Sequence, residues 1–439
     1  MATRQTKDVP TGTLRAHPSN SHTHPKKQIR QIARSIEQFG FTAPIIVDEH
    51  NVILAGHGRW LAAKDLGVAS VPVVVVSGLS EAERRAYLLA DNKLAEKAGW
   101  NKAALAFELN GLAPLLEEAG LDIALTGFEP PEIDALMADL VDPEADPDDE
   151  PPSLANEPVS RAGDLWLLGP HRLLCGDARA EAHFQGLMGQ ELAALVFADP
   201  PYNVSIKSIQ GRGKIKHGDF GMASGEMSKA QFTQFLTATL TLAAKHSANG
   251  AIHYVCMDWR HLDEILAAGN KAYSELKNLV VWTKTNAGQG SFYRSQHELI
   301  FVFKNGEQPH RNNFELGQHG RNRSNVWTYP GVNAFRAGRL DDLSTHPTVK
   351  PVALVADVMR DCSRRSDIVL DPFMGSGTTI LAAERVGRRA YGLEIDPLYV
   401  DAAVRRWQDF TKRDASLKGS PQTFDDVAAA RTGRRRRRR

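Results

Sequence analysis

The chain has 439 residues, enough for two or three domains of ordinary size. Its composition, 42% hydrophobic and 24% charged, is typical of a soluble globular protein, and no apolar run approaches the ~18 residues of a membrane-spanning helix. Lys and Arg total 53 and Asp and Glu total 52, so the net charge is +1; without the six consecutive arginines 434–439 it is −5. We therefore expect a mildly acidic body with a basic tail, which either binds nucleic acid or serves only solubility.

The three cysteines, Cys175, Cys256 and Cys362, lie far apart in the sequence. Their spacing excludes a disulfide framework and a CxxC zinc site, and we expect no metal centre. The polar N-terminus has no signal-peptide pattern, and a chain without disulfides suits a reducing compartment. We therefore expect a cytoplasmic protein with no membrane partner.

The first 140 residues predict a small α+β domain with a helical extension. After a polar, irregular stretch over 1–25, a compact pattern of helices and strands starts at Lys26. Ser80 is the expected N-cap of the last helix in this pattern, and Glu83 completes a capping box. Helical patterning then continues to about residue 140. The expected elements are helices 28–39 and 59–66, strands 44–48 and 71–76, and the helix that follows Ser80.

An acidic, proline-rich run separates this first domain from the rest of the chain. It has no apolar periodicity, so we expect residues 141–160 to form a solvated linker. From 161 to 412 strands and helices alternate, and several strands are apolar throughout, as parallel strands buried on both faces are. The pattern predicts an α/β domain followed by a disordered, arginine-rich tail over 413–439. The expected strands are 165–168, 173–174, 192–197, 251–256, 279–282, 299–303, 368–370 and 390–393.

The first chemical motif, Asp199-Pro200-Pro201-Tyr202, directly follows one of these strands. In open α/β sheets ligands bind at the carboxyl ends of the strands. The carboxylate of Asp199 and the carbonyl of Pro200 offer two hydrogen-bond acceptors, and the ring of Tyr202 offers a stacking face. Together they suit a planar group that bears an –NH2. The alternative is a simple surface turn, because Asp and Pro are also common in turns.

The second motif is the glycine loop of Asp371-Pro-Phe-Met-Gly-Ser-Gly-Thr-Thr379, which lies between a strand and a helix. The next strand ends at Glu394, an acid suited to ribose hydroxyls. No lysine follows Gly377, which excludes a P-loop, and Ile380 stands where a dinucleotide fingerprint has a third glycine. The loop is therefore suited to a nucleoside without a pyrophosphate, and S-adenosylmethionine fits that description.

A third motif, His346-Pro-Thr-Val-Lys350-Pro351, precedes a helix expected over 352–359 and could also be simple helix capping. In combination, the three motifs and the Gly-Leu-Glu-Ile-Asp run resemble the amino-group DNA methyltransferases. The catalytic motif precedes the cofactor motif, the order of the permuted beta class. The resemblance covers about 161–412 and implies a Rossmann-like domain that binds S-adenosylmethionine.

The resemblance also implies roles for individual residues. The catalytic set that holds the extruded base is Asp199, Pro200, Pro201 and Tyr202. Asp177, in a short Gly-Asp motif that could equally be a turn, matches the adenine-side acid of the family. The cofactor-binding set implied by the motifs is Asp177, Lys350, Asp371, Phe373, Gly375, Gly377, Thr378 and Glu394.

The implied reaction is a direct displacement that needs no metal and no covalent intermediate, so the protein supplies proximity and hydrogen-bond acceptors. In the family, Asp at the first motif position goes mostly with adenine N6 and Ser with cytosine N4, so Asp199 favours adenine. The rivals are cytosine N4 methylation, methylation of RNA or of a glutamine side chain, and a ParB-like binding protein whose methylase half is degenerate. No Pro-Cys dipeptide of the carbon-5 cytosine enzymes occurs.

Two basic stretches between the motifs are candidate DNA-facing loops, although any enzyme also has polar surface loops. Arginine and asparagine read base edges in the major groove, and aromatic side chains stack. We expect double-stranded DNA as partner, a nucleoid-associated location, and a monomer or homodimer. Residues 282–303, which include Glu298, are expected to form a wall of the pocket. The predicted DNA-binding residues are Lys207, Arg212, Lys214, Arg321, Arg323 and Arg336.

Residues 8–100 resemble the ParB/sulfiredoxin-like domains through Ile53-Leu-Ala-Gly-His-Gly-Arg59 and Ala90-Asp-Asn-Lys93. Gly56 and Gly58 would bring backbone close to a phosphate that Arg59 holds. ParB partition proteins usually have an acid where His57 stands, which argues against nucleotide hydrolysis. No helix-turn-helix is evident after this region. We predict an accessory module that binds DNA or a nucleotide, the alternative being a purely structural domain.

Overall fold

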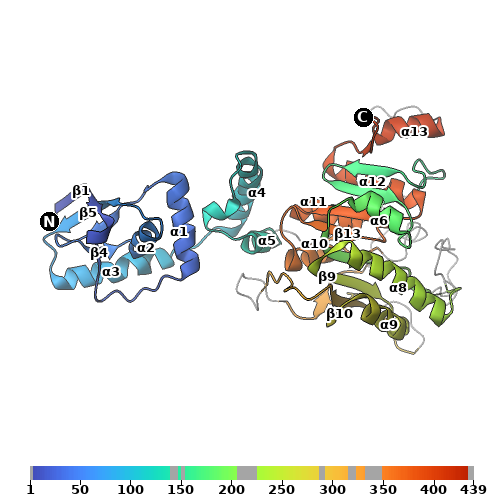
Figure 1. Cartoon of the computed structure of the whole chain (residues 1–439), viewed down its shortest axis with the longest axis horizontal. Coiled ribbons are helices and arrows are strands. Elements are labelled where there is room, and N and C mark those ends of the chain that lie inside the picture. The colour runs from blue at the N-terminus through green and yellow to red at the C-terminus, as the bar shows by residue number, and fades with distance from the viewer. Residues whose placement is uncertain are drawn as a thin grey trace. The chain divides into compact units, whose positions relative to one another are not determined.

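The computed structural model describes residues 3–138, 147–149, 154–204, 225–285, 292–314, 323–331 and 349–433. The chain divides into two compact units, Met1–Met137 and Ala138–Arg439 (Figure 1). Over the described ranges, no helix combines the length and the apolar character that crossing a membrane requires.

The first unit contains a five-stranded sheet in the order β1-β5-β3-β4-β2. Its apolar core is formed by buried residues of four of these strands, β1, β3, β4 and β5, and of the second helix. The elements are β1 (Thr3–Pro10), η1 (Thr11–Thr13), β2 (Arg15–Ala16), α1 (Lys26–Phe39), β3 (Ile45–Val47), β4 (Val52–Ala55), α2 (His57–Asp65), β5 (Ser70–Ser77), α3 (Glu81–Glu96), α4 (Lys102–Glu118), η2 (Ile123–Thr126) and α5 (Pro130–Ala138).

Most local predictions for this unit are confirmed, and one is wrong. The capping box of α3 is present: the Ser80 amide donates to Glu83 Oε2 at 2.8 Å, and the Glu83 amide donates to Ser80 Oγ at 3.3 Å. We expect residues 1–25 to be irregular, but β1 pairs antiparallel with β5 along its whole length. The strand escapes prediction because it is an exposed edge strand with no apolar alternation, and its paired residues lie 60 to 74 positions away.

The second unit contains a ten-stranded sheet in the order β12-β10-β11-β9-β8-β13-β14-β7-β6-β15. The elements are η3 (Pro147–Asp149), β6 (Leu165–Leu168), β7 (His171–Cys175), α6 (Glu181–Met188), β8 (Ala193–Ala198), α8 (Lys229–Lys245), β9 (Ser247–Met257), η4 (Trp259–His261), α9 (Leu262–Ala272), β10 (Glu275–Thr283), β11 (His297–Lys304), β12 (Val326–Thr328), α10 (Val352–Cys362), β13 (Ile368–Asp371), α11 (Thr378–Val386), β14 (Arg389–Glu394), α12 (Pro397–Thr411), β15 (Ser416–Leu417) and α13 (Phe424–Thr432).

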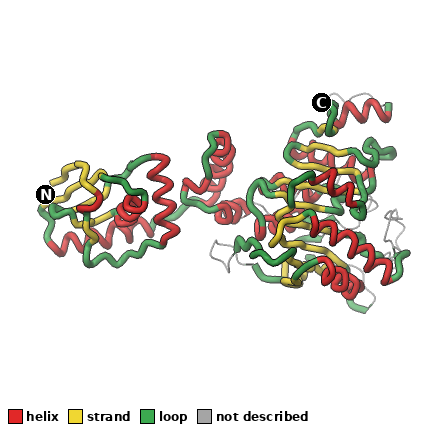
Figure 2. The backbone as a smooth tube through the Cα atoms, in the orientation of Figure 1, coloured by secondary structure: helices red, strands yellow, loops and turns green. Residues whose placement is uncertain are grey.

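Helices cover both faces of this sheet, and Figures 1 and 2 show the resulting three layers. Alternate residues of β8 belong to opposite layers: Leu195 and Phe197 pack with α10, α11 and α12, while Val196 and Ala198 pack with α6, α8 and α9. Because both faces are buried, β8 is apolar throughout. The predicted α/β, Rossmann-like class is confirmed.

The predicted boundaries of this unit need two corrections. The expected disordered tail over 413–439 is folded as far as residue 433: β15 pairs with β6, and the fully buried ring of Phe424 in α13 meets Trp166 edge-on at 5.0 Å. The expected linker also ends earlier, because the amides of Val159 and Ser160 donate to Asp401 at 2.5 and 2.9 Å. Both segments are held by core residues more than 200 positions away, which local composition does not encode. The arginines 434–439 lie outside the described residues.

Candidate active site

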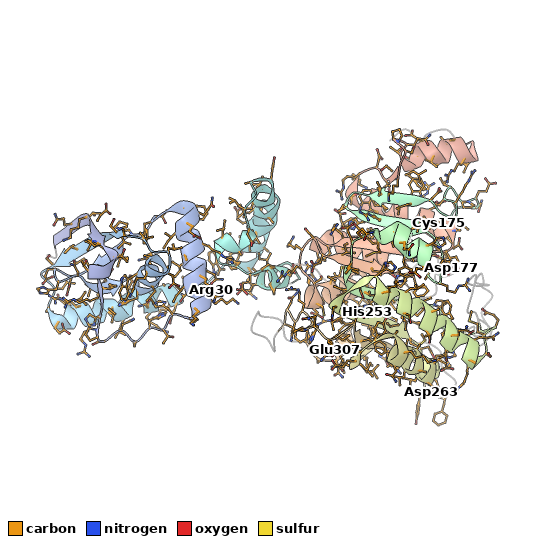
Figure 3. The ribbon with its side chains drawn as sticks, in the orientation of Figure 1. Arg30, Cys175, Asp177, His253, Asp263 and Glu307 are labelled. Atoms are coloured by element: carbon orange, nitrogen blue, oxygen red, sulfur yellow. The ribbon has the colours of Figure 1, made fainter. Side chains whose placement is uncertain are left out.

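Four acidic residues follow the carboxyl ends of four neighbouring strands. Strands β8, β13, β14 and β7 are adjacent and parallel, so their carboxyl ends share one edge of the sheet. In this order the edge presents Asp199, Asp371, Glu394 and Asp177, the last marked in Figure 3. The chain runs outward in opposite directions from β8 and β13, and such a switch point is where α/β sheets bind ligands.

The motif after β8 forms a hydrogen-bonded turn at this switch point. The Tyr202 hydroxyl lies 2.7 Å from Asp199 Oδ1 and donates to it, while Pro200 is buried and Pro201 half-buried. Asn203 has a left-handed backbone, φ 51°, and its side chain bonds Met227 at the start of the next described segment. Asn203 was missed by sequence reasoning, although an asparagine directly after the tetrad could have suggested such a turn.

Lys350 completes a cluster of charged side chains around Asp199. Its Nζ lies 2.6 Å from Asp199 Oδ2, 3.1 Å from Glu298 Oε2 and 3.1 Å from the Tyr202 hydroxyl. Glu298 in turn accepts from Lys284 Nζ at 2.5 Å. We predicted Lys350 as a cofactor residue, but the structure pairs it with Asp199 because the chain before α10 returns to the end of β8. Lys284 was not predicted at all, and Glu298 was predicted only as part of a wall.

Burial and the paired charges set the protonation of this cluster. Burial raises the pKa of Asp199, and the neighbouring Lys350 offsets part of that rise. Burial also acts against the charge of Glu298, but Lys350 and Lys284 outweigh it and lower its pKa to about 2. Burial opposes the ammonium of Lys350, yet the two carboxylates raise its pKa. Burial and the same carboxylates keep the pKa of Tyr202 well above its usual range, so it stays a neutral hydrogen-bond donor.

The glycine loop after β13 is held by two acids that accept hydrogen bonds from uncharged groups. Asp371 accepts from the Phe373 amide at 2.9 Å and from Thr379 Oγ1 at 2.5 Å. Glu394 accepts from the Gly375 amide at 2.8 Å and from the Asp396 amide at 2.9 Å. Burial raises the pKa of both acids to about 7, and these hydrogen bonds offset only part of the rise. The two acids of this loop therefore change charge near neutral pH.

The two predicted glycines of this loop do different things. Gly375 has φ +53°, and no described residue lies within 4 Å of the position that a Cβ would take there, so the described surroundings beside Glu394 are open. Gly377 has φ +89°, and a Cβ there would lie 2.8 Å from the Cβ of Ala403 in α12. Gly375 therefore leaves room for a ligand, whereas Gly377 permits the close packing of α12.

The remaining predicted cofactor residues lie around the same loop. The Phe373 ring is half-buried, 6.1 Å from the ring of Phe235 in α8. Asp177 follows β7 directly beside Glu394 and is paired with Arg179 at 2.6 Å; burial opposes its charge, but Arg179 lowers its pKa. Thr378 differs from the others, because its hydroxyl accepts from Arg406 Nη1 at 3.2 Å in the interior.

Of the six predicted DNA-binding residues, only Arg323 lies within the described ranges; Lys207, Arg212, Lys214, Arg321 and Arg336 lie outside them, as does His346. The Arg323 guanidinium lies 3.2 Å from Asp361, 3.3 Å from Asp357 and 3.0 Å from the Tyr329 hydroxyl. This geometry favours a structural role against α10 over the DNA contact that we predicted.

The residues of the N-terminal glycine motif make several contacts within their own unit. A Cβ at Gly58 would lie 2.9 Å from the side chain of Ile32, so this glycine serves the packing of α2 on α1. Arg59 folds back over Gly56 and donates to the carbonyl of Pro44 at 3.2 Å. His57 is buried, and burial lowers its pKa to about 4.

Three family models match the chain, and they cover both units. Residues 193–405 match a DNA methylase family of N6/N4 type, and residues 2–92 match the ParB N-terminal domain. The chain thus resembles an N6/N4 DNA methylase over one stretch and a ParB N-terminal domain over another. Residues 103–162 match the helix-turn-helix domain of ParB-methyltransferases, so our prediction of no helix-turn-helix is wrong. The region reads as one continuous helical pattern in the sequence, but the structure divides it into α4, η2 and α5.

Individual curated relatives and solved structures resemble the chain over about half of its length. The chain is 27% identical over 237 residues to the type II methyltransferase M2.DpnII of Streptococcus pneumoniae, covering 51% of this chain and 85% of the relative. It is 28% identical over 226 residues to M2.LlaDCHI of Lactococcus lactis subsp. cremoris, covering 48% and 81%. Among solved structures, the cytosine-N4-specific PvuII DNA methyltransferase matches with 16% identity, 58% and 89% coverage, and a TM-score of 0.42.

Proposed function

We propose that this protein transfers a methyl group from S-adenosylmethionine to the exocyclic amino group of a base extruded from double-stranded DNA, namely N6 of adenine. One observation supports this most strongly. The acceptor turn of Asp199 and Tyr202 ends β8, and the open glycine loop with Glu394 ends the neighbouring β13 and β14. A donor and an acceptor bound at adjacent strand ends meet at the edge of the sheet.

The residues of the loop fit a nucleoside cofactor. Glu394 uses each oxygen for one backbone amide and keeps lone pairs for ribose hydroxyls, while Gly375 leaves space beside it. Asp177 and Phe373 would bound the same cofactor on either side. S-adenosylmethionine supplies an electrophilic methyl group when it is bound.

The catalytic turn acts on the base. The Asp199 carboxylate and the Pro200 carbonyl accept the two amino hydrogens, which draws the nitrogen lone pair out of conjugation with the ring, and the Tyr202 ring stacks on the base. As positive charge develops on the nitrogen, the carboxylate stabilises it. The bound cofactor would supply the methyl group to the amino nitrogen, and Asp199 would accept the proton that this nitrogen releases.

Cysteine chemistry is not required by this proposal. All three cysteines are buried, and burial raises the pKa of Cys256 and of Cys175, the latter to about 12. Thiols in such surroundings are poor nucleophiles. This supports attack by the amino group over carbon-5 methylation through a cysteine adduct.

The test is to express the full chain in a bacterium that lacks DNA methylation and to map modified bases by single-molecule sequencing. We expect N6-methyladenine at one short sequence with the wild-type chain and none with Asp199→Ala. Glu307→Gln, which alters an exposed acid distant in sequence from the motifs, is the matched control and should keep the activity (Figure 3). N4-methylcytosine would correct the base, and an unmodified genome with folded protein would refute the proposal.

A further inference from the structure

The hairpin of β10 and β11 opens at the catalytic edge of the sheet. Pairing of the two strands continues beyond Thr283 through the Lys284 amide, which donates to the Gln296 carbonyl at 2.8 Å, and the Gln296 side chain returns a bond to Lys284 at 2.9 Å. Next to this last pair, Lys284 contacts Glu298, and Glu298 contacts Tyr202 at 3.1 Å. Both arms of the hairpin are therefore bonded to the catalytic cluster.

Two aromatic side chains, which precede β11 in the sequence, project into solvent. Phe292 is 86% exposed and Tyr293 is 82% exposed, the two highest values among the large hydrophobic side chains of the described ranges. Their rings contact each other edge-to-face at 4.6 Å. Isolated exposed hydrophobic residues are ordinary, but an adjacent pair of bare aromatic rings marks a surface that a partner covers.

We propose that Phe292 and Tyr293 insert into the base stack of the DNA beside the extruded nucleotide and hold the duplex open. This inference rests on the proposed function, since it requires a base in the Tyr202 pocket. Two residues separate Tyr293 from Gln296, and the three steps between their Cα atoms span at most about 10 Å, so the rings stay near the pocket. Apolar and aromatic wedges of this kind stabilise unstacked DNA, because every base offers a π-face.

DNA is favoured over a protein partner by the position of the pair. The rings stand on the loop whose arms bear Lys284 and Glu298, so whatever occupies the catalytic turn passes beside them. A protein docking there would block the base pocket. Binding of a second copy of the chain or of another protein to this surface would not depend on base pairing in the substrate. A substrate with altered base pairing therefore distinguishes these partners from DNA.

The experiment compares two duplexes that contain the methylation site found by sequencing. One is fully paired, and the other has an abasic site opposite the target base, which removes the pairing that extrusion must break. The double variant Phe292→Ala with Tyr293→Ala should lose on the order of 10- to 100-fold in kcat/KM on the paired duplex, the worth of one or two base–aromatic stacks. On the abasic duplex its rate should return close to that of the wild type.

Leu276→Ala is the matched control, since Leu276 is an exposed apolar residue, 41%, at the opposite end of β10. It should behave as wild type on both duplexes. An equal loss of kcat/KM by the double variant on both duplexes, or no loss on the paired duplex, would refute the insertion of Phe292 and Tyr293 into the base stack. Either result would leave the proposed methylase activity in place. A wild-type chain that methylates neither duplex would instead count against the proposed function.

Discussion

At two neighbouring parts of one sheet edge, the acidic side chains have different partners: a charged lysine at one and uncharged hydrogen-bond donors at the other. At the end of β8, Asp199 and Glu298 share Lys350, so the cluster is built of full charges. At the ends of β13 and β14, Asp371 and Glu394 accept from amides and a hydroxyl, and burial raises their pKa to about 7. The first part therefore keeps a fixed charge pattern for the chemistry, whereas the second can change its charge near neutral pH.

The largest expected effect is the loss of methyl transfer when Asp199 is replaced, and it should distinguish the end of β8 from the glycine loop. Asp199→Ala should lower the transfer rate by at least about 1,000-fold, since it removes the acceptor for the developing charge. Affinity for S-adenosylmethionine should persist, because the Asp199 carboxylate bonds Tyr202 and Lys350 rather than the glycine loop. Calorimetric titration beside a radiolabel transfer assay checks both; parallel loss of binding and transfer would assign Asp199 to the cofactor instead.

A pair of substitutions tests the charge balance around Asp199. Lys350→Met removes the cation that lowers the pKa of Asp199, so the acidic limb of the pH–rate profile should move to higher pH, with a loss on the order of 100-fold near neutrality. Glu298→Gln removes an anion that raises the same pKa, so the limb should move to lower pH. Two shifts in the same direction would show that these residues act through folding rather than charge.

Substitution of each glycine of the loop should distinguish a residue needed for helix packing from one needed for cofactor binding. Gly377→Ala should reduce the free energy of unfolding by about 3 kcal/mol, from left-handed backbone strain and the clash with Ala403. Gly375→Ala should cost only about 1 kcal/mol of stability but weaken cofactor binding. Thermal denaturation and calorimetric titration of both variants measure this, and equal stability losses would contradict the assignment.

The smallest effect concerns the pH dependence of cofactor affinity. A carboxylate accepts hydrogen bonds from ribose hydroxyls better than a protonated acid does, so affinity should rise as pH increases through about 7, where Glu394 loses its proton. The slope is at most about tenfold per pH unit for one proton. Glu394→Gln should bind more weakly and with a flatter profile between pH 6 and 8; an unchanged slope would place the titrating group elsewhere.

Residues that follow their own strand or helix were predictable from local sequence. Asp199, Asp371 and Glu394 each end an apolar strand, and Ser80 and Glu83 form their capping box within four positions. Their placement depends on strand polarity and backbone geometry that neighbouring residues impose.

Only the tertiary structure shows which residues from distant parts of the sequence meet. Lys350 reaches Asp199 across 151 positions, Glu298 reaches Tyr202 across 96, and Phe424 finds its place against Trp166. The sequence by itself determined the class of fold, the strand ends and the chemical motifs, because periodicity and turn chemistry act over a few residues. Which cation pairs with which acid depended on the sheet order, and only long-range packing establishes that order.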